Sequence, residues 1–282
     1  MVIMLAKKIV RNLLFLVSIL LVGILFSGCG ADKAATAQND GKSEVTLKVG
    51  AALVPHTDIL NFIKPKLKEA GINLEIVNLD DEDQLNPALQ EKQIDANYFQ
   101  HLPYLESVAK EKGYDFVSAA KVHVEPMGFY SQKIKSLDAL PDGAKIAIPN
   151  NPSNEFRSLV ILQKQGLIKL RTDVKNFAAT PKDIVENPKN LQFVEVEPAQ
   201  LVRALPDVDG AVINTNWILE AKIDPNSALF REDADSPYAN ILVVRKNDEN
   251  RPEIQKLVQI LQSDDVRKFI EDKYKGAVVP AF

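Results

Sequence analysis

The hydrophobic pattern from residue 45 onward alternates between the period of strands and the period of helices. Val45–Leu53 alternates apolar and polar residues and then reaches a loop beyond a glycine, which is typical of a strand end. Asp58–Ile72 has apolar residues at helical spacing, and Asn73–Leu79 is again strand-like. Strand, helix and strand within about 35 residues predict a βαβ unit, with a parallel sheet and a right-handed crossover.

The alternation continues along the first set and then begins a second one. The further elements of the first set are a helix near Leu85–Glu91, a strand near Asp95–Tyr98, a helix near Leu102–Lys112 and a strand near Asp115–His123. The second set comprises strands at Ala144–Asn150, Leu191–Glu197 and Gly210–Trp217, a helix from Pro152 to Gly166 and a helix at Pro198–Pro206. No internal sequence repeat is evident.

Two strand-like links join these sets, one near Val122–Tyr130 and one near Tyr238–Val244. A strand at Asn240–Lys246 and a helix over Arg251–Tyr274 then return to the first set. The pattern predicts an α/β protein with two lobes and two crossings. The first lobe comprises residues 45–125 and 239–282, and the second lobe comprises residues 126–238.

The N-terminal segment is not expected to belong to this fold. Lys7, Lys8 and Arg11 precede Leu13–Phe26, an apolar run without a charge, and small residues follow. This order is typical of an export signal. A transmembrane anchor is the alternative, because the run approaches the length that spans a bilayer.

The single cysteine of the chain, Cys29, directly follows Ser27 and Gly28. This arrangement resembles the lipobox of bacterial lipoproteins, in which the cysteine carries acyl lipid such as palmitate and becomes the first mature residue. Phe26 stands where the lipobox prefers leucine, and the alternative is a signal peptide that is cut near an incidental cysteine. We therefore expect a signal peptide over residues 1–28 and a flexible polar tether over residues 29–44.

Composition and charge exclude several classes of protein. The 282 residues are 46% hydrophobic and 26% charged, with a net charge of −4, so a basic nucleic-acid-binding surface is not expected. Removal of residues 1–28 leaves 31 basic against 38 acidic residues, a net charge of −7. One cysteine and three histidines are too few for a disulfide framework or a zinc-finger array. GxSxG, Walker A and GxGxxG motifs are absent, which favours a binding protein without a cofactor over an enzyme.

Polar and aromatic clusters follow the predicted strands. They are VPHTD, NYFQH and HVEPMGFY in the first lobe and PNNPSNEFR and INTNW in the second. Open α/β sheets bind ligands at the carboxyl ends of their strands. The sequence therefore predicts that these clusters face each other across a cleft between the lobes.

Arg157 is the principal candidate for binding an anion. It lies in the first turns of a helix capped by Asn151 or Ser153. A cation at this end interacts unfavourably with the helix dipole, at a cost of about 0.3–1 kcal/mol. Its guanidinium could bind a ligand carboxylate. A salt bridge to Glu155 or another surface acid is the alternative.

Several asparagines are candidates for the polar end of a ligand. Asn214 and Asn216 would share one face of a strand, although Asn216 could instead cap a helix from Trp217. Asn154 and Asn240 could bind ligand or stabilise turns.

Tyr98, Phe99 and His101 could form an aromatic wall for an apolar group of the ligand. For Phe99, a place in the hydrophobic core is an equal alternative. Metal binding by His56, His101 and His123 with Glu125 is the less favoured alternative, because no HxxH or HExxH spacing is present. For His56, helix capping or surface exposure is expected.

The sequence from Lys48 to Phe282 resembles the NlpA family of lipoproteins and, within it, the methionine-binding components of ABC importers. The resemblance is carried by the segments DANYFQHLPYL, VEPMGFYSQKIKSLDALPDGAKIAIPN, NPSNEFRSLVILQKQGLIKL, ATPKDIVENPKNLQFVEVE, AVINTNW, DSPYAN and GAVVPAF. It implies a two-lobed fold like that of the type II periplasmic binding proteins, with two crossover hinge strands, that closes on its ligand.

The resemblance also implies roles for single residues. The arginine that matches Arg157 pairs with the ligand carboxylate, and the asparagines that match Asn214 and Asn240 hold the polar end of the amino acid. The residues that match Tyr98, Phe99 and His101 enclose the thioether. Further pocket members are His123, Glu125 and Tyr130. The chain departs from the family at Phe156, Asn151 and Trp217, where Gly, Asp and Tyr are common.

The function that this resemblance implies is the capture of L-methionine by a monomeric, lipid-anchored protein outside the cytoplasm. The protein would deliver its ligand to the permease and ATPase of an ABC importer. The alternatives are the same fold with D-methionine, a methionine-containing dipeptide or another apolar amino acid, and a metal-binding lipoprotein.

Overall fold

The computed structural model describes residues 44–79, 81–174, 179–233 and 236–282. The signal peptide and nearly all of the tether expected from the sequence lie outside these residues. Within the described part of the chain, no helix combines the length and the apolar character that crossing a membrane requires.

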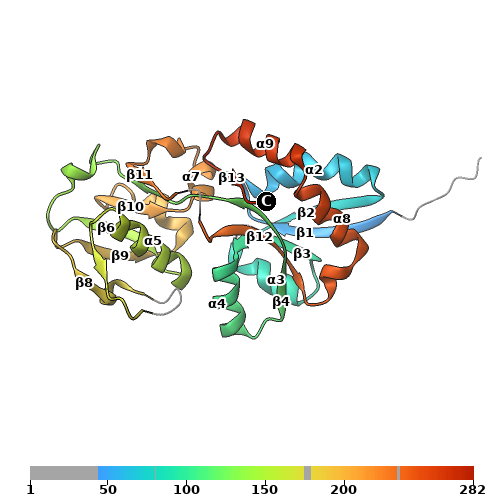
Figure 1. Cartoon of the computed structure of the whole chain (residues 1–282), viewed down its shortest axis with the longest axis horizontal. Coiled ribbons are helices and arrows are strands. Elements are labelled where there is room, and N and C mark those ends of the chain that lie inside the picture. Colours follow the sequence, from blue (N-terminus) through green and yellow to red (C-terminus); the bar gives the residue numbers. More distant parts are fainter. Residues whose placement is uncertain (1–43, 80, 175–178, 234–235) are drawn as a thin grey trace, which may run out of the picture. The chain divides into compact units, whose positions relative to one another are not determined.

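The first lobe is built on a six-stranded sheet with the order β13-β4-β12-β3-β1-β2 (Figure 1). Its strands are β1 (Val45–Ala51), β2 (Ile72–Asn78), β3 (Ala96–His101), β4 (Phe116–Val124), β12 (Ala239–Arg245) and β13 (Val279–Pro280). β1 is parallel to both β2 and β3, which confirms the βαβ unit. β12 runs antiparallel to β3 and β4, so the sheet is mixed rather than wholly parallel.

Helices cover both faces of this sheet. The elements are α2 (His56–Glu69), α3 (Leu85–Gln90), α4 (Leu102–Lys112), α8 (Pro252–Leu261) and α9 (Asp264–Tyr274). Successive residues of β12 alternate between the two faces: Leu242 packs with α2, α8 and α9, whereas Val243 packs with α3 and α4. Side chains buried on both faces explain why Ile241–Val244 of β12 is a continuous apolar run.

The single helix predicted over Arg251–Tyr274 was wrong, because two helices occupy this range. Gln262 ends α8 by donating its backbone N–H to the carbonyls of Val258 and Ile260. Ser263 is extended and starts α9, whose first turn contains Asp264 and Asp265. A serine followed by acidic residues is a helix-start signal, which the apolar periodicity alone did not show.

The second lobe contains a five-stranded sheet with the order β11-β5-β10-β6-β9. Its strands are β5 (Gly128–Tyr130), β6 (Lys145–Pro149), β9 (Gln192–Val196), β10 (Gly210–Ile213) and β11 (Phe230–Arg231), and β7 (Lys169–Leu170) pairs separately with β8 (Ile184–Glu186). The helices are α5 (Pro152–Lys164), α6 (Leu201–Ala204) and α7 (Thr215–Glu220). The strand predicted over Gly210–Trp217 therefore ends early, at Ile213.

Short 3-10 turns connect several of these elements in both lobes. They are η1 (Glu82–Gln84), η2 (Leu137–Ala139), η3 (Pro181–Asp183), η4 (Pro198–Gln200), η5 (Pro225–Ser227) and η6 (Asp248–Asn250).

Two connections join the lobes, from β4 to β5 and from β11 to β12. They are hydrogen-bonded to each other where Glu232 donates its backbone N–H to the carbonyl of Met127 at 2.8 Å. The carboxylate of Glu232 in turn accepts the N–H of Met127 at 3.4 Å. The residue limits of the lobes given above stay a prediction.

Gly210 allows close packing in the second lobe. A Cβ at this position would lie 2.1 Å from Cζ of Phe129, whose buried ring stacks on Phe230 at 5.1 Å. We expect Gly210→Ala to lower the free energy of unfolding by about 1–3 kcal/mol, because the trapped ring has little room to move. Urea unfolding measures this loss.

Phe129→Leu supplies the matched background for this test. The cost of Gly210→Ala should shrink in that background, because the smaller side chain relieves the overlap. An equal cost in both backgrounds would contradict the proposed clash.

Candidate functional site

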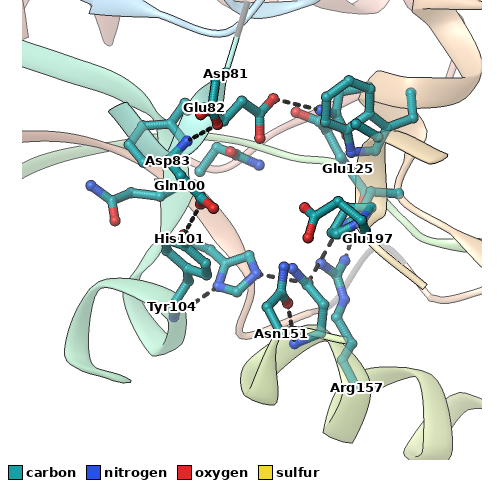
Figure 2. A pocket seen from close by; sticks show the side chains of 18 residues that line it. Asp81, Glu82, Asp83, Gln100, His101, Tyr104, Glu125, Asn151, Arg157 and Glu197 are labelled. Carbon is teal, nitrogen blue, oxygen red and sulfur yellow. Dashed lines mark hydrogen bonds between the residues drawn. The ribbon is translucent and has the colours of Figure 1, made fainter. Parts of the chain in front are cut away.

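A cavity of about 380 Å³ lies between the lobes (Figure 2). Its volume is within the range of about 300–1,000 Å³ that is typical of small-molecule sites. Residues of both lobes and of one connection line it: Asp81, Glu82, Asp83, Phe99, Gln100, His101, Tyr104, Glu125, Asn151, Asn154, Arg157, Glu197, Pro198, Ala199, Asn214, Asn216, Trp217 and Asn240. Four of the five clusters that follow the predicted strands therefore meet at the cavity, whereas VPHTD contributes no residue to its lining.

The capped start of α5 fixes the position of Arg157 in the next turn. Asn151 caps the helix by accepting the N–H of Asn154 at 3.3 Å, and Pro152 is the first helical residue. Proline suits this position because its missing N–H would have no partner inside the helix. Arg157 follows within the second turn and is only 2% exposed.

The guanidinium of Arg157 pairs with Glu232, which follows β11 on the second connection. Nε lies 3.0 Å and Nη2 lies 2.5 Å from Oε2 of Glu232, and Nη2 also donates to the backbone carbonyl of Glu125 at 2.8 Å. The group packs over the ring of Tyr238 at 4.3 Å, a cation–π contact. The salt bridge anticipated as an alternative thus exists, but its partner is Glu232, whose side chain is 8% exposed, and not Glu155.

Nη1 of Arg157 has no hydrogen-bond partner among the described residues. Arg157 also lines the cavity. The pair with Glu232 therefore fixes the plane of the guanidinium and leaves two N–H donors for another group.

A chain of hydrogen bonds fixes the orientation of two cavity amides. Nδ1 of His101 accepts the backbone N–H of Tyr104 at 3.2 Å, so the hydrogen of the neutral ring lies on Nε2. Nε2 then donates to Oδ1 of Asn154 at 3.0 Å, and Nδ2 of Asn214 donates to the same oxygen at 3.3 Å. The buried Oδ1 of Asn214 is left as an acceptor without a partner in the described part of the chain.

Burial, followed by the nearby Arg157 charge, lowers the pKa of His101 to about 3. The ring is therefore neutral at physiological pH. The bond between His101 and Asn154 joins the start of α4 in the first lobe to α5 in the second.

A second bond between the lobes connects Nδ2 of Asn216 to Oε1 of Glu82 at 3.0 Å. Burial raises the pKa of Glu82 to about 8, and the carboxylate of Glu125 adds to this rise. Asn216 lies in α7 and Asn214 just before it, so the two were wrongly predicted to share a strand face. Both nevertheless line the cavity.

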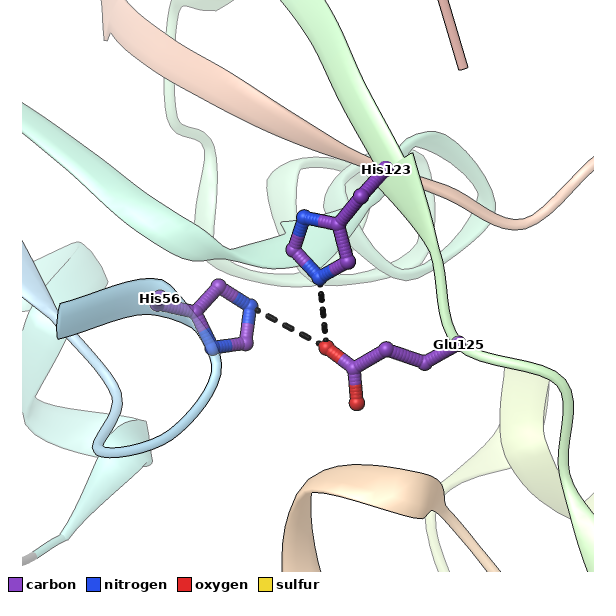
Figure 3. Close-up of side chains that lie close together, drawn as sticks. All are labelled: His56, His123 and Glu125. Carbon is purple, nitrogen blue, oxygen red and sulfur yellow. Dashed lines mark hydrogen bonds and ion pairs between the residues drawn. The ribbon is translucent and has the colours of Figure 1, made fainter. Parts of the chain in front are cut away.

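His56, His123 and Glu125 form a buried cluster beside the cavity (Figure 3). Oε1 of Glu125 lies 2.8 Å from Nε2 of His123 and 3.4 Å from Nε2 of His56. The hydroxyl of Tyr98 bonds to Nδ1 of His123, and Nε2 of His56 bonds to Oδ1 of Asn240 at 3.0 Å. The expectation that His56 caps a helix or lies exposed was wrong, because α2 has no side-chain cap and the ring is buried.

Burial governs the charges of this cluster. It lowers the pKa of His56 to about 4 and that of His123 to about 3, and it raises the pKa of Glu125. The ligating atoms of the two neutral imidazoles and the carboxylate lie within 4.8 Å of one another. Zinc also binds such a set of ligands. His56, His123 and Glu125 belong to the metal-binding set considered from the sequence, whereas its fourth member, His101, bonds to Asn154 and Tyr104 instead.

Most of the candidates named from the sequence line the cavity. They are Phe99, His101, Glu125, Asn154, Arg157, Asn214, Asn216 and Asn240. Tyr98 does not line it together with Phe99, because successive residues of β3 face opposite sides of the sheet, and Tyr98 packs in the other core cluster.

His123 bonds to Tyr98 and Glu125 behind the cavity. Tyr130 packs in the core of the second lobe and donates its hydroxyl to the carbonyl of Pro225 at 3.3 Å. Phe156 packs against a core cluster of the second lobe rather than the cavity. Residues that the sequence did not single out include Glu82, Glu197 and Glu232.

Two α/β lobes, two connecting segments and a polar cavity between them define a two-lobed solute-binding protein. The sequence profile of the NlpA lipoprotein family matches residues 47–282. The chain belongs to the NlpA lipoprotein family.

Individual relatives agree with this assignment. The methionine-binding lipoprotein MetQ of Bacillus subtilis is 42% identical over 274 residues, which cover 95% of this chain and 98% of the relative. A nutrient-binding protein from Burkholderia cenocepacia, solved bound to methionine, is 45% identical with a TM-score of 0.81 and covers 84% of this chain and 100% of its own. A periplasmic substrate-binding protein of an ABC transporter from Coxiella burnetii is 43% identical with a TM-score of 0.79, covering 83% of this chain and 100% of its own.

The pair of Arg157 and Glu232 yields a stability prediction. Glu232→Gln keeps the shape of the side chain but leaves the buried guanidinium without a counter-charge, and we expect a loss of about 3 kcal/mol in the free energy of unfolding. The matched control is Glu186→Gln, which breaks the exposed pair with Lys169 and should cost within about 0.5 kcal/mol. Equal losses in urea unfolding would contradict the role of the buried pair.

Proposed function

We propose that this protein captures methionine in the cavity between its lobes and delivers it to an ABC importer. The observation that carries this proposal is the polarity of the cavity wall. Donors and acceptors left over from the internal hydrogen bonds match the two charged ends of a free amino acid. The relatives named above, which include a methionine-bound structure, support methionine as the particular ligand.

The ligand carboxylate is assigned to Nη1 of Arg157. A guanidinium binds carboxylates well because its N–H groups are coplanar and always charged. Its own charge is balanced by Glu232, so a bound carboxylate gains hydrogen bonds without meeting the full attraction of an unpaired cation. This arrangement favours a zwitterion over a strongly acidic ligand.

The ligand ammonium is assigned to the carboxylate of Glu125 and to Oδ1 of Asn214. Glu125 lines the cavity, and its carboxylate bonds to His123 and lies 3.4 Å from Nε2 of His56. Both rings are neutral, and Arg157 bonds only to the backbone carbonyl of Glu125. A buried carboxylate without a cationic hydrogen-bond partner among the described residues is stabilised by an incoming ammonium.

The apolar part of the ligand is assigned to the aromatic part of the wall. Phe99, Tyr104 and Trp217 line the cavity and offer the faces and edges that a thioether contacts favourably. D-methionine, a methionine-containing dipeptide and other apolar amino acids share parts of this chemistry. A thermal-shift screen with L-methionine beside these ligands distinguishes them, and elemental analysis tests the alternative of a metal-binding lipoprotein at His56, His123 and Glu125.

Hinge closure is the proposed mechanism of capture. The lobes contribute different parts of the wall, so only the closed state contacts both ends of the ligand, and the ligand therefore shifts the population toward closure. The bonds from His101 to Asn154 and from Asn216 to Glu82 add direct contacts between the lobes in the closed state. The protein would hold its ligand without chemical turnover, as a monomer, with the importer's permease and ATPase as partners.

The proposed location is the outer face of a membrane, through lipid on Cys29. Membership of a lipoprotein family and the residues around Cys29 support this location.

Arg157→Ala should weaken the binding of methionine by at least about 2 kcal/mol, because it removes the charged donor from a buried carboxylate. Isothermal titration calorimetry measures the change. In Arg157→Ala, the carboxylate of Glu232 is left without its partner, which could itself weaken binding. The double variant Arg157→Ala with Glu232→Gln removes that charge and should show the same loss, because the loss comes from the missing guanidinium. Arg171→Ala, at an exposed arginine paired with Asp173, is the control. Unchanged affinity in the Arg157 variants would count against the assigned role.

Cys29→Ser should release the protein from the membrane fraction, because serine lacks the thiol that carries the lipid. Fractionation and mass spectrometry of full-length protein measure the distribution and the attached lipid. Ser27→Ala, which keeps a small residue before the cysteine, is the control and should stay with the membrane. Retention of the Cys29 variant would favour a transmembrane anchor instead.

A further inference from the structure

His56 is a buried polar side chain beside the cavity to which the proposed function assigns no contact with the ligand. It begins α2, is 1% exposed, and packs edge to face against Tyr98 and His123 at 4.8 and 5.0 Å. It does not line the cavity, but Nε2 reaches two residues that do, Asn240 at 3.0 Å and Glu125 at 3.4 Å (Figure 3).

The surroundings of the ring determine which nitrogen carries its hydrogen. Nδ1 of His56 is buried and has no partner among the described residues, so a hydrogen there would be an unsatisfied donor. Nε2 faces the Oε1 atom of Glu125, and a lone pair on Nε2 would be repelled by a carboxylate oxygen. Both effects place the hydrogen on Nε2.

This hydrogen sets the orientation of the Asn240 amide. The two ends of an asparagine amide are nearly equal in size, so hydrogen-bond partners decide which end faces a given direction. With a donor at Nε2 of His56, Asn240 must turn Oδ1 toward the ring, as observed. Its Nδ2 is then available on the other side of the amide, in a residue that lines the cavity.

We propose that His56 is a positioning residue of the ligand site, which orients Asn240 so that its Nδ2 donates to the carboxylate of the ligand. This role rests on the proposed function and adds to it a selectivity for ligands with a free carboxylate. The opposite orientation would present Oδ1 to the carboxylate, and two acceptors would then face each other.

Metal binding is the competing role for the same ring. A histidine that binds a metal through one nitrogen usually donates the hydrogen of the other nitrogen to an acceptor. Nδ1 of His56 has no such acceptor in the described part of the chain. The surroundings therefore match a hydrogen-bond donor at Nε2 better than a metal ligand there.

The tautomer can be measured in the wild-type protein without any ligand. Long-range 1H–15N correlation spectra of protein labelled at the histidine rings, assigned with His56→Gln, report which nitrogen is protonated. We expect the Nε2–H form for His56 and no change on adding zinc to chelator-treated protein. An Nδ1–H form, or a zinc-dependent shift of the His56 nitrogens, would overturn the proposal whether or not methionine binds.

A double-mutant cycle tests whether His56 acts through Asn240. His56→Met removes the hydrogen-bond donor and keeps a similar side-chain size. It should weaken the binding of methionine about tenfold, the equivalent of one hydrogen bond. The binding of methionine amide, which lacks the carboxylate, should weaken less. His56→Gln places an amide N–H near the position of Nε2 and should recover most of the loss. In the Asn240→Ala background, His56→Met should cause no further loss.

These experiments distinguish a failure of the positioning role of His56 from a failure of the proposed function. Additive losses from His56→Met and Asn240→Ala, or equal losses for methionine and methionine amide, would overturn the positioning role while methionine binding stands. A wild-type protein that binds no methionine would contradict the proposed function itself. Urea unfolding of each variant shows whether a loss of affinity merely follows a loss of stability.

Discussion

The buried pair of Arg157 and Glu232 is the interaction on which the rest of the site depends. A guanidinium that is 2% exposed is costly to bury without a counter-charge, and Glu232 provides one from the second connection between the lobes. The same glutamate is bonded through its backbone and its carboxylate to Met127 on the first connection. One charge pair thus ties the ligand-facing helix α5 to the segments about which the lobes would move.

The cavity obtains its polarity from internal hydrogen bonds rather than from many charges. The backbone N–H of Tyr104 fixes the ring of His101, and the ring fixes Asn154, which leaves Oδ1 of Asn214 as an acceptor. Each bond removes one of two orientations that an isolated imidazole or amide would have. A site organised in this way loses little free energy in orienting its side chains when a ligand arrives.

The sequence predicted the fold better than the details of the site. Strand and helix periods identified the two lobes, but they missed the break at Ser263 and the strand end at Ile213, where local start signals outweigh the periodicity. Arg157 was found because a cation at a helix start is unusual. Glu232 was not found, and the contact of His56 with Asn240 was not predicted, because the partners lie 75 and 184 residues away in the chain and no spacing connects them.

The most direct test of the account is a crystal structure of the protein grown with L-methionine. The account predicts a methionine in the cavity, with its carboxylate on Nη1 of Arg157 and its ammonium near Glu125 and Asn214, while Glu232 still holds the other edge of the guanidinium. A carboxylate bound away from Arg157, or a cavity that stays without methionine at saturating concentration, would contradict it.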